Sequence, residues 1–327
     1  MHILIIGAAG MIGRKLTAAL VKAGGLGGRP VERLTLADVI APAVPPGFPG
    51  KTDAIAADLS APGVAASLVA SRPDVIFHLA AIVSGEAEAD FDKGYRINLD
   101  GTRLLLEAIR QAGMSAPYVP RLVFTSSIAV FGAPFPEAIG DEFFSTPLTS
   151  YGTQKAICEL LLNDYSRRGF VDGVGIRLPT VVVRPGKPNA AASGFFSNIL
   201  REPLAGQEAV LPVSRDVRHW FASPRAAIGF LLHAATLDSS RLGWRRTVSA
   251  PGLSATVGEE IEALGRIAPR AVSLIREEPN ETIVRIVAGW PRNFEAKRAV
   301  GLGFTAESSM DEIIRAHIED ELGGHLG

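Results

Sequence analysis

The chain has 327 residues, of which 47% are hydrophobic and 20% are charged. This composition is typical of a globular protein with a large core, and it argues against intrinsic disorder. With 33 basic and 34 acidic side chains, the formal net charge is -1, so no net field attracts nucleic acid or an anionic membrane. The length exceeds that of one compact core, and we expect one large domain with a smaller one appended.

Cysteine usage and the N-terminal residues bear on the cellular compartment. Cys158 is the single cysteine, which excludes an internal disulfide or a thiolate metal cluster and suits a reducing compartment. The apolar N-terminal run has no basic region before it and is interrupted by glycine, so we interpret it as a buried strand rather than a signal peptide. No apolar run reaches the roughly 18 residues of a membrane helix. We expect a cytoplasmic protein and, because its histidines are scattered singly, no metal site.

In the first half of the chain, short apolar or β-branched runs alternate with segments of helical periodicity. The predicted strands are His2–Ile6, 34–37, 54–56, 75–79, 121–124 and 174–178. The predicted helices are 12–23, 64–71, 98–112 and 153–168. This succession predicts an α/β fold, in which a doubly wound parallel (Rossmann) sheet is covered by helices on both faces.

After Pro179 the pattern changes, because prolines and glycines become frequent and the strand and helix signals become shorter. We therefore expect residues 1–178 to form a nucleotide-binding domain. Residues 179–327 are expected to form mainly a smaller α+β substrate domain, with some segments returning to the first sheet. Helices are predicted at 224–237 and 257–267. A last helix is predicted after Ser309, because Glu312 has the spacing of a capping box.

A glycine-rich run, Gly7-Ala8-Ala9-Gly10-Met11-Ile12-Gly13, directly follows the first predicted strand and opens a helix. Lacking Cβ atoms, Gly7 and Gly10 let the backbone approach a pyrophosphate, whose charge then faces the N–H groups at the helix start. Gly13 would let the helix pack close to the strand. The run predicts a dinucleotide site that includes Met11 and Ile12, whereas the alternative is a tight turn without a ligand.

Acidic residues follow the second and third predicted strands. Asp38 lies 25 residues beyond Gly13, where a carboxylate accepts hydrogen bonds from ribose hydroxyls of the adenosine and repels a 2′-phosphate. No arginine occurs in the following Val39-Ile40-Ala41, so we expect NAD rather than NADP. Asp58, with Leu59 beside it, is predicted either to contact the adenine or to act as a surface cap.

The pair Tyr151 and Lys155 has the four-residue spacing that puts both side chains on one face of a helix. As a base, Tyr151 needs its pKa lowered from about 10 by roughly three units, and we expect the lysine ammonium and a nicotinamide ring to lower it. Ser127, just past the fifth predicted strand, is expected to donate to the substrate oxygen. Ser126 or Thr125 would do so only if the turn were rotated. The alternative for Tyr151 and Lys155 is that both are surface residues. The alternative for Thr125 to Ser127 is a polar strand end that satisfies local backbone groups.

Several segments occur together in one characteristic order and spacing. They are Gly7-x-x-Gly10-x-x-Gly13, His78-Leu79-Ala80-Ala81, Asn98-x-x-Gly101-Thr102, the stretch from Phe124 to Gly132, and Tyr151-x-x-x-Lys155. The set, which covers roughly the first 185 residues, resembles the extended short-chain dehydrogenase/reductase family, in its NAD-dependent epimerase/dehydratase type. The resemblance implies that Tyr151 is the acid/base, that Lys155 also binds nicotinamide ribose hydroxyls and that Ser127 orients the substrate oxygen. It further implies that Leu79, Ala80 and Ala81 line the cofactor groove and that Asn98 fixes the neighbouring helix.

The C-terminal half resembles the D-erythronate dehydrogenase branch of this family, in Gly194-Phe195-Phe196-Ser197, residues 201–206, Arg218-His219-Trp220 and Gly289-Trp290-Pro291. The resemblance implies oxidation of the 2-hydroxyl of D-erythronate, or of a related sugar acid, to the 2-oxo acid. Nucleotide-sugar epimerases resemble the same first half, yet many carry an asparagine shortly after the sixth strand, where this chain reads Arg177-Leu178-Pro179-Thr180-Val181. We expect Pro179 beside the cofactor, and Thr180 and Ser126 beside the substrate.

Arg218, His219 and Trp220 offer a cation, a proton donor and an apolar wall, a set that suits a small hydroxy acid. The alternative is a partly buried structural tryptophan flanked by surface charges. His78 is interpreted as a core residue and Cys158 as a packing residue.

Two other functions stay open at this point. In an epimerase with tightly bound NAD, oxidation is followed by re-reduction and no NADH accumulates. A redox-sensing binding module would not need Ser127, Tyr151 and Lys155 together. The helices after Asn98 and Tyr151 are expected to pair two subunits as a homodimer. Apolar residues on them either line that seam or pack on the sheet, namely Leu104, Leu105, Ile157, Leu160 and Leu161.

Overall fold

The structure is a computed structural model that describes residues 1–186 and 192–325. Its internal contacts divide the chain into two compact units. Unit 1 comprises Met1–Val130, Thr149–Arg177 and Ile228–Ser249, and unit 2 comprises Phe131–Leu148, Leu178–Ala227 and Ala250–Gly327. Residues Phe131–Leu148, which we expected in the first domain, thus group with unit 2.

Unit 1 is built on a seven-stranded sheet in the order β13-β9-β7-β6-β1-β4-β5. Its strands are β1 (His2–Ile6), β4 (Arg33–Asp38), β5 (Lys51–Ala56), β6 (Val75–His78), β7 (Arg121–Ser127), β9 (Asp172–Leu178) and β13 (Thr247–Ser249). Strand β1 pairs in parallel with β4 on one side and with β6 on the other. The direction of winding therefore reverses between β1 and β6, the place where open α/β sheets bind ligands. The doubly wound α/β fold predicted from the sequence is confirmed.

The strand predictions differ from the structure mainly at their ends. Strand β1 has the predicted bounds, because Ile3, Leu4 and Ile5 are buried on both faces of the sheet and form an uninterrupted apolar run. Strand β7 continues three residues beyond its apolar part, through Thr125 to Ser127. The seventh strand, β13, was missed, because three residues carry too little periodicity to be recognised.

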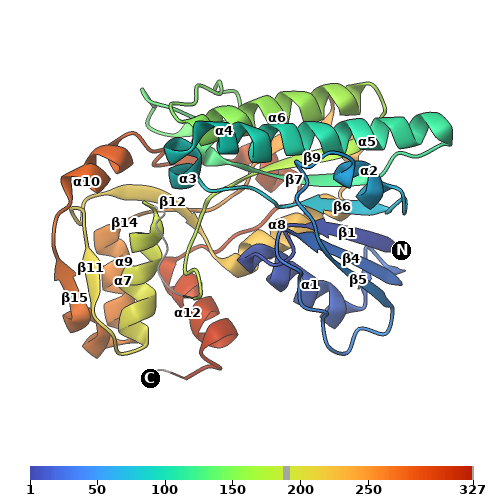
Figure 1. Ribbon diagram of the computed structural model, residues 1–327. Coiled ribbons are helices and arrows are strands. Elements are labelled where there is room, and N and C mark those ends of the chain that lie inside the picture. The colour runs from blue at the N-terminus through green and yellow to red at the C-terminus, as the bar shows by residue number, and fades with distance from the viewer. Residues whose placement is uncertain (187–191, 326–327) are drawn as a thin grey trace. The chain divides into compact units, whose positions relative to one another are not determined.

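Helices cover both faces of this sheet. Those of unit 1 are α1 (Met11–Ala23), α2 (Val64–Val69), α3 (Ser84–Ala89), α4 (Phe91–Gly94), the π-helix η1 (Tyr95–Asp100), α5 (Gly101–Ser115), the short η2 (Ile128–Val130) and α6 (Ser150–Arg167). Helices α5 and α6 run side by side over one face, while α1 covers the other (Figure 1). The predicted helix 98–112 thus begins earlier, as a π-helical turn, and continues as α5. Apolar residues such as Leu105 and Leu162 fill the core beneath α5 and α6.

Small sheets and helices make up unit 2, as expected of an α+β domain. Its sheets are β10 (Thr180–Val181)-β12 (Arg218–Ala222)-β14 (Leu253–Thr256), β11 (Ala209–Leu211)-β15 (Ile275–Glu277) and β16 (Phe294–Glu295)-β8 (Ile139–Gly140). Its helices are α7 (Gly194–Leu204), α9 (Val257–Ile267), η4 (Pro269–Leu274), α10 (Glu281–Ala288), α11 (Lys297–Gly301) and α12 (Met310–Glu321). The remaining elements of unit 1 are β2 (Gly25–Leu26), β3 (Arg29–Pro30) and η3 (Ser239–Leu242). Helix α8 (Pro224–Thr236) divides between the units, because its first residues belong to unit 2 and the rest to unit 1.

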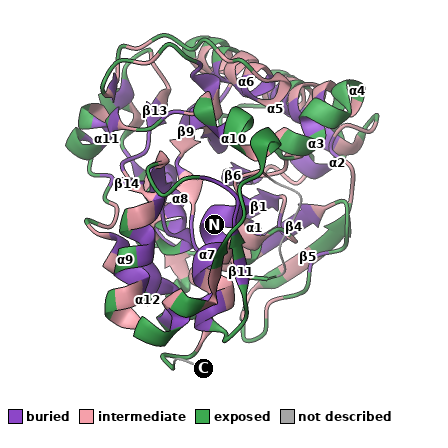
Figure 2. Cartoon of the chain, turned by 90° about the vertical axis from the view of Figure 1, so that its left-hand side faces the viewer, coloured by how far each residue is buried: buried purple, intermediate pink, exposed green. Residues whose placement is uncertain are grey.

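The apolar faces of α7, α9 and α12 form the core of unit 2, and Figure 2 shows buried and exposed faces on α9 and α12. Helix α12 starts after Ser309 as predicted, and the Ser309 hydroxyl accepts a 3.3 Å hydrogen bond from the Glu312 N–H. The Glu312 carboxylate, however, binds the N–H of Ser308 rather than that of Ser309. The predicted capping box is therefore only half formed. Within the described part of the chain, no helix is both long and apolar enough to span a membrane.

Candidate active site

The glycine turn lies at the carboxyl end of β1, against the segment that follows β6. Gly7 has φ +92°, and a Cβ on it would lie 2.7 Å from the Ala80 nitrogen. A Cβ on Gly13 would clash with the Gly7 carbonyl. Both glycines are thus required by the protein's own backbone. The contact also brings the predicted cofactor residues Leu79, Ala80 and Ala81 next to the turn.

Gly10 is different, because the protein leaves room beside it. A Cβ there would meet only the Gly7 carbonyl oxygen, at 3.4 Å. Gly10 is the N-cap of α1, no side chain caps this helix end, and no acidic residue occupies its first turn. The N–H groups of a helix start and its dipole favour a phosphate. The turn therefore fits the pyrophosphate of a dinucleotide, with Gly10, Met11 and Ile12 nearest to it.

Asp38 lies at the end of β4 and braces this turn. One carboxylate oxygen accepts a 2.9 Å hydrogen bond from the Ala9 N–H, and the other accepts a 2.7 Å bond from the Val39 N–H. Each oxygen retains a lone pair for a ribose hydroxyl. Val39 and Ile40 are exposed, and neither can neutralise a 2′-phosphate. The local chemistry suits NAD.

Asp58 links the segment after β5 to the π-helix η1. Its carboxylate accepts hydrogen bonds from the N–H and hydroxyl of Ser60, and another of 2.9 Å from Arg96. Burial acts to raise the pKa of Asp58, but these hydrogen bonds and the Arg96 charge hold it below its usual range. Leu59 beside it is buried. Asp58 thus caps the turn at Ser60 and also pairs with Arg96, while its contact with the adenine stays a prediction.

Asn98 is buried in η1 and fastens two segments together. Its amide donates to the Gln154 side chain at 2.7 Å and to the Ile82 carbonyl at 3.2 Å, and its oxygen accepts a 2.9 Å bond from the Ile82 N–H. It thereby joins the segment after β6 to α6. These contacts agree with the fixing role that the family resemblance implied.

The reacting groups meet where β7 ends and α6 begins. Thr149 caps α6 by accepting a 3.1 Å hydrogen bond from the Gly152 N–H, which places Tyr151 in the first helical turn. The Ser127 hydroxyl lies near enough to the Tyr151 phenol to lower its pKa, and it accepts a 3.1 Å hydrogen bond from the Ala129 N–H. Lys155 follows one turn later and is buried. The structure thus brings the three residues of the predicted catalytic set together.

Of the three hydroxyls at the end of β7, only that of Ser127 is placed to meet a substrate. Thr125 donates to the His78 carbonyl at 3.1 Å, and Ser126 donates to the buried Glu159 carboxylate at 2.5 Å. Both side chains are buried, whereas Ser127 is partly exposed. The expectation that Ser126 contacts the substrate is therefore wrong, because its hydroxyl points into the protein.

Lys155 does not hydrogen-bond to the Tyr151 phenol. Its ammonium donates to the Thr125 carbonyl at 2.8 Å and lies 4.7 Å from the centre of the Phe124 ring and 5.8 Å from that of Tyr151. Burial lowers the pKa of Lys155 to about 8, while Cys158 and Glu159 act in the opposite direction. The pKa of Lys155 therefore lies close to neutral pH.

Tyr151 is held as a phenol by the protein's own groups. Burial raises its pKa to about 12, and the nearby Ser127 hydroxyl offsets only part of this rise. The sequence led us to expect that Lys155 would help to ionise the tyrosine directly, but its charge is not among the causes of the shift. The required fall in pKa depends on a further positive charge near the phenol.

His78 and Cys158, which we expected to be structural residues, are both buried and hydrogen-bonded. His78 forms a 2.8 Å hydrogen bond with Thr102, and burial, together with the Lys155 charge, lowers its pKa to about 3, so its ring is neutral. Cys158 is buried, donates to the Asn98 carbonyl, and has its pKa raised by burial. Neither side chain is suited to proton transfer at neutral pH.

The three predicted substrate residues on β12 do not converge. Successive residues of β12 point to opposite faces of its sheet. Trp220 packs on Phe294, with 5.4 Å between the ring centres, whereas His219 stacks on Phe196. Arg218 pairs with Glu259 at 3.3 Å. The expected set of cation, proton donor and apolar wall is therefore wrong, because strand alternation separates its members.

His219 forms the polar centre of its own face. Its Nε2 lies 2.6 Å from the Thr180 hydroxyl oxygen. Burial lowers its pKa to about 4, aided by the charge of Arg184. Trp290 lies beside it, 5.4 Å between ring centres. Thr180 and His219 are thus brought together as a neutral hydrogen-bonded pair.

Arg184 is a residue that the sequence analysis missed. Its guanidinium donates to the Val181 carbonyl and to Ser193, and no carboxylate of the described residues pairs with it. Burial and the neighbouring Arg201 lower its pKa. A largely buried cation without a counter-ion is a candidate anion site. The only sequence signal was an arginine next to a proline and a glycine.

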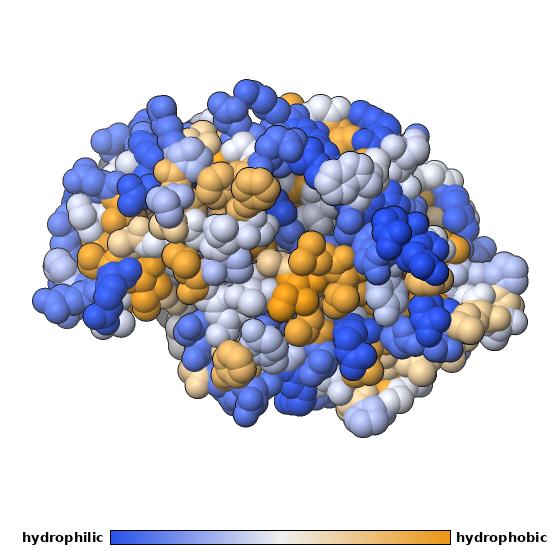
Figure 3. All heavy atoms as spheres, turned by 90° about the horizontal axis from the view of Figure 1, so that it is seen from above, coloured by the Kyte–Doolittle hydropathy of each residue, from blue (hydrophilic) through white to orange (hydrophobic). Residues whose placement is uncertain are grey.

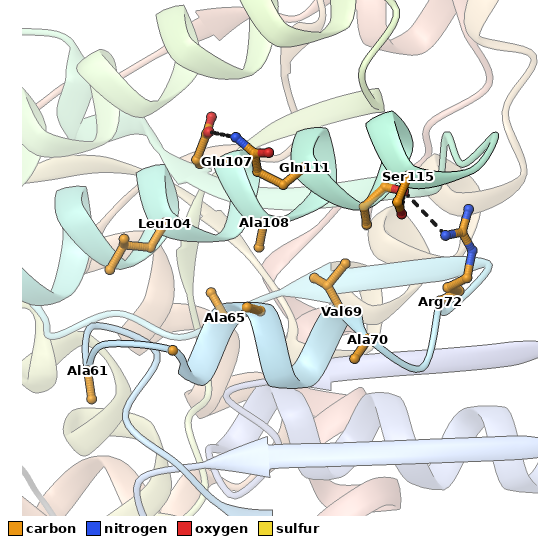
Figure 4. Close-up of a pocket in the computed structure, with 13 residues that line it drawn as sticks. Ala61, Ala65, Val69, Ala70, Arg72, Leu104, Glu107, Ala108, Gln111 and Ser115 are labelled. Carbon is orange, nitrogen blue, oxygen red and sulfur yellow. Dashed lines mark hydrogen bonds between the residues drawn. The ribbon is translucent and has the colours of Figure 1, made fainter.

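Two surface hollows lie away from these residues. One, of about 450 Å³, lies between α2 and α5 and is lined mostly by small apolar side chains such as Ala65, Val69 and Ala108 (Figure 4). The other, of about 500 Å³, lies in unit 2 beside Trp220 and Phe294. The first contains no predicted site residue, and the second contains only Trp220. No cluster of three potential metal ligands occurs within residues 1–186 and 192–325.

Comparison with known proteins decides the family. Residues 3–236 match the NAD dependent epimerase/dehydratase family. The chain belongs to this family. The family predicted from the sequence motifs is thereby confirmed, and NAD is the cofactor, which agrees with the glycine turn and with Asp38.

Relatives with known names or structures match this chain over nearly its whole length. A D-erythronate dehydrogenase from Cupriavidus necator is 49% identical over 329 residues, which cover 98% of each chain. One from Haemophilus influenzae is 42% identical and covers 98% of this chain and 100% of its own. A solved structure described as the nucleoside-diphosphate-sugar epimerase from Agrobacterium tumefaciens is 72% identical, with a TM-score of 0.99, and covers 100% of this chain and 96% of its own.

Proposed function

We propose that this chain is an NAD-dependent dehydrogenase that oxidises the 2-hydroxyl of D-erythronate, or of a closely related sugar acid, to the 2-oxo acid. The observation that carries the chemistry is the meeting of Ser127, Tyr151 and Lys155 at the carboxyl end of β7. The substrate assignment rests on the two D-erythronate dehydrogenases that match the chain over 98% of its length.

In the proposed mechanism, Tyr151 accepts the proton of the substrate hydroxyl. NAD supplies a hydride acceptor for the carbon that bears this hydroxyl. Ser127 donates a hydrogen bond to the same substrate oxygen and holds it beside the phenol. Lys155, anchored on the Thr125 carbonyl, contributes its positive charge and binds the nicotinamide ribose hydroxyls.

We propose the following cofactor contacts along the carboxyl ends of β1, β4, β5 and β6. The glycine turn binds the pyrophosphate, Asp38 the adenosine ribose, and Asp58 with Leu59 the adenine side. The complete set is Gly7, Gly10, Met11, Ile12, Gly13, Asp38, Asp58, Leu59, Leu79, Ala80, Ala81, Asn98, Tyr151, Lys155 and Pro179. Asn98 acts in this proposal by holding the Ile82 backbone.

For the substrate we propose Ser127 and, from unit 2, Thr180, His219 and Arg184. Arg184 supplies the positive charge that a sugar acid requires, since no carboxylate of the described residues neutralises it. Arg218 and Trp220 are not included, because the former pairs with Glu259 and the latter packs on Phe294.

An epimerase is the second candidate, because the 72% identical structure is described as a nucleoside-diphosphate-sugar epimerase. Many such epimerases carry an asparagine shortly after the sixth strand, where this chain reads Arg177-Leu178-Pro179-Thr180-Val181. The stretch contains no asparagine, which argues against a sugar diphosphate as the substrate. We therefore favour the dehydrogenase.

The experiment that separates the two follows NADH while purified protein reacts with NAD and either four- to six-carbon sugar acids or nucleotide sugars. Steady NADH release with D-erythronate supports the proposal. Interconversion of a nucleotide sugar without NADH accumulation would overturn it in favour of the epimerase.

We also propose a homodimer that pairs through α5 and α6. Leu160 is 72% exposed on α6, and Leu104, Ile157 and Leu161 are partly exposed, whereas Leu105 is fully buried against the sheet. Figure 3 views the side that carries these helices and shows hydrophobic patches among hydrophilic side chains. The molar mass in solution tests this, with Leu160→Glu expected to give monomers.

A further inference from the structure

Glu159 is a buried carboxylate one helical turn beyond Lys155, on the same side of α6. Its exposed fraction is 7%. One carboxylate oxygen accepts hydrogen bonds from the Ser126 hydroxyl at 2.5 Å and from the Arg177 Nε at 2.9 Å. The other accepts a 2.6 Å bond from a terminal nitrogen of Arg177. The carboxylate thus joins α6, β7 and β9 below the reacting groups.

The contact with Ser126 matters because of what its two neighbours do. The carbonyl of Thr125 holds the Lys155 ammonium at 2.8 Å, and the hydroxyl of Ser127 lies near enough to Tyr151 to lower the pKa of its phenol. Ser126 joins these two residues directly along β7. A carboxylate that fixes Ser126 therefore fixes both the anchor of Lys155 and the hydroxyl that faces Tyr151.

We propose that Glu159 is a positioning residue of the Ser127–Tyr151–Lys155 site, which holds the end of β7 in place and supplies the negative charge that keeps Lys155 an ammonium. The inference deepens the proposed function and rests on it for its activity readout. Glu159 does not touch the substrate, and its effect passes through Ser126 and Lys155.

The groups that face Lys155 support the electrostatic part. From β6, His78 is neutral, and from β7 the Phe124 ring and the Thr125 carbonyl lie against the ammonium. From α6, the phenol of Tyr151 and the thiol of Cys158 both have raised pKa values and are uncharged at neutral pH. Cys158 and Glu159 both oppose the effect of burial on the pKa of Lys155, and Glu159, itself paired with Arg177 of β9, is the carboxylate among these groups. An opposite charge at close range shifts a pKa by about one to three units.

The competing explanation is that Glu159 and Arg177 form a buried ion pair that only stabilises the fold. Breaking such a pair destabilises a protein by leaving one charge uncompensated. Loss of activity alone would not separate this explanation from a positioning role. The test therefore needs a readout that responds to the charge on Lys155.

The experiment compares Glu159→Gln and Glu159→Asp with the wild-type chain. The amide of the first variant can still accept from Ser126 but carries no charge, whereas the second keeps the charge. Glu107→Gln is the matched control, because Glu107 accepts from Arg110 in the same unit but lies outside the site. For each chain we would measure Tm, the pH dependence of kcat/KM and the pH dependence of the Kd for NAD.

In Glu159→Gln we expect kcat/KM to fall about tenfold or more at neutral pH. The high-pH limb of the activity profile, and the pH above which NAD binding weakens, should both move down by about one unit. Glu159→Asp should retain the wild-type limb, and Glu107→Gln should match wild type in both profiles. A Glu159→Gln profile with unmoved limbs, whatever its Tm, would overturn the proposal. If wild type forms no NADH from any sugar acid, the proposed function fails, while the NAD profiles still test Glu159.

Discussion

The ammonium of Lys155 donates a 2.8 Å hydrogen bond to the backbone carbonyl of Thr125. This bond ties the first turns of α6 to the end of β7, the two elements that carry Tyr151 and Ser127. Lys155 therefore shapes the site through the backbone, and its ammonium makes no hydrogen bond to the Tyr151 phenol.

Replacing Tyr151 by Phe removes the proposed proton acceptor and little else, because Ser127 is the one side chain that acts on the pKa of the phenol. We expect kcat to fall by about 10²- to 10⁴-fold, with the Kd for NAD within about twofold of wild type. Steady-state kinetics and calorimetric titration measure the two. Tyr165→Phe, on the same helix, is the control and should keep its activity. Retention of most activity by Tyr151→Phe would identify another residue as the base.

The activity should depend on pH in two directions. Tyr151 must lose its proton to act, so activity should rise with pH, whereas Lys155 must keep its proton, so activity should fall as pH passes through the lysine pKa. Without cofactor, the pKa is about 12 for Tyr151 and about 8 for Lys155. Because the tyrosine pKa is the higher one, little of the chain has an ionised Tyr151 together with a protonated Lys155 at any pH. We therefore expect the ascending limb of kcat, which reports the complex with NAD and substrate, to lie well below 12.

The pKa of Tyr151 in the absence of NAD is measured by titrating the phenolate absorbance of the wild-type chain and subtracting that of Tyr151→Phe. An ascending limb that coincides with this value would show that the bound cofactor does not lower the pKa of Tyr151.

Gly10 offers a substitution that separates NAD binding from folding. A Cβ at Gly10 meets only one atom, at 3.4 Å, whereas a Cβ at Gly13 clashes with the turn. We expect Gly10→Ala to keep its Tm within a few degrees but to weaken NAD binding by tenfold or more, because the added methyl group fills the space near the helix start. Gly13→Ala should lose both stability and binding. Unchanged NAD affinity in Gly10→Ala would place the pyrophosphate elsewhere.

Arg184 tests the nature of the substrate. Replacing it by Gln removes the charge but retains hydrogen-bond donors, so the KM for a sugar acid should rise by about tenfold or more, while the Kd for NAD stays unchanged. Arg215→Gln is the comparison variant in the same unit, since Arg215 pairs with Glu277. Equal effects of Arg184→Gln on the acid and on the corresponding uncharged polyol would contradict a role in binding the carboxylate.

Features that depend on neighbouring residues were predictable from the sequence. The bounds of β1 follow from a continuous apolar run, and the helical position of Tyr151 and Lys155 follows from their spacing. The glycine turn was recognisable because a strand precedes it and a helix follows it. Short elements such as β13 and the π-helix η1 were not, since a few residues carry no distinct periodicity.

The sequence by itself determined the fold class and the cofactor and supplied the candidate reacting side chains, because each depends on short segments whose local geometry is set by their own residues. Only the tertiary structure decided that Ser126 turns inward to Glu159, that Arg218 and Trp220 point away from His219, and that half-buried Arg184 has no carboxylate partner among the described residues. Those outcomes depend on strand alternation and on partners distant in the chain, and on how burial shifts the pKa of each group.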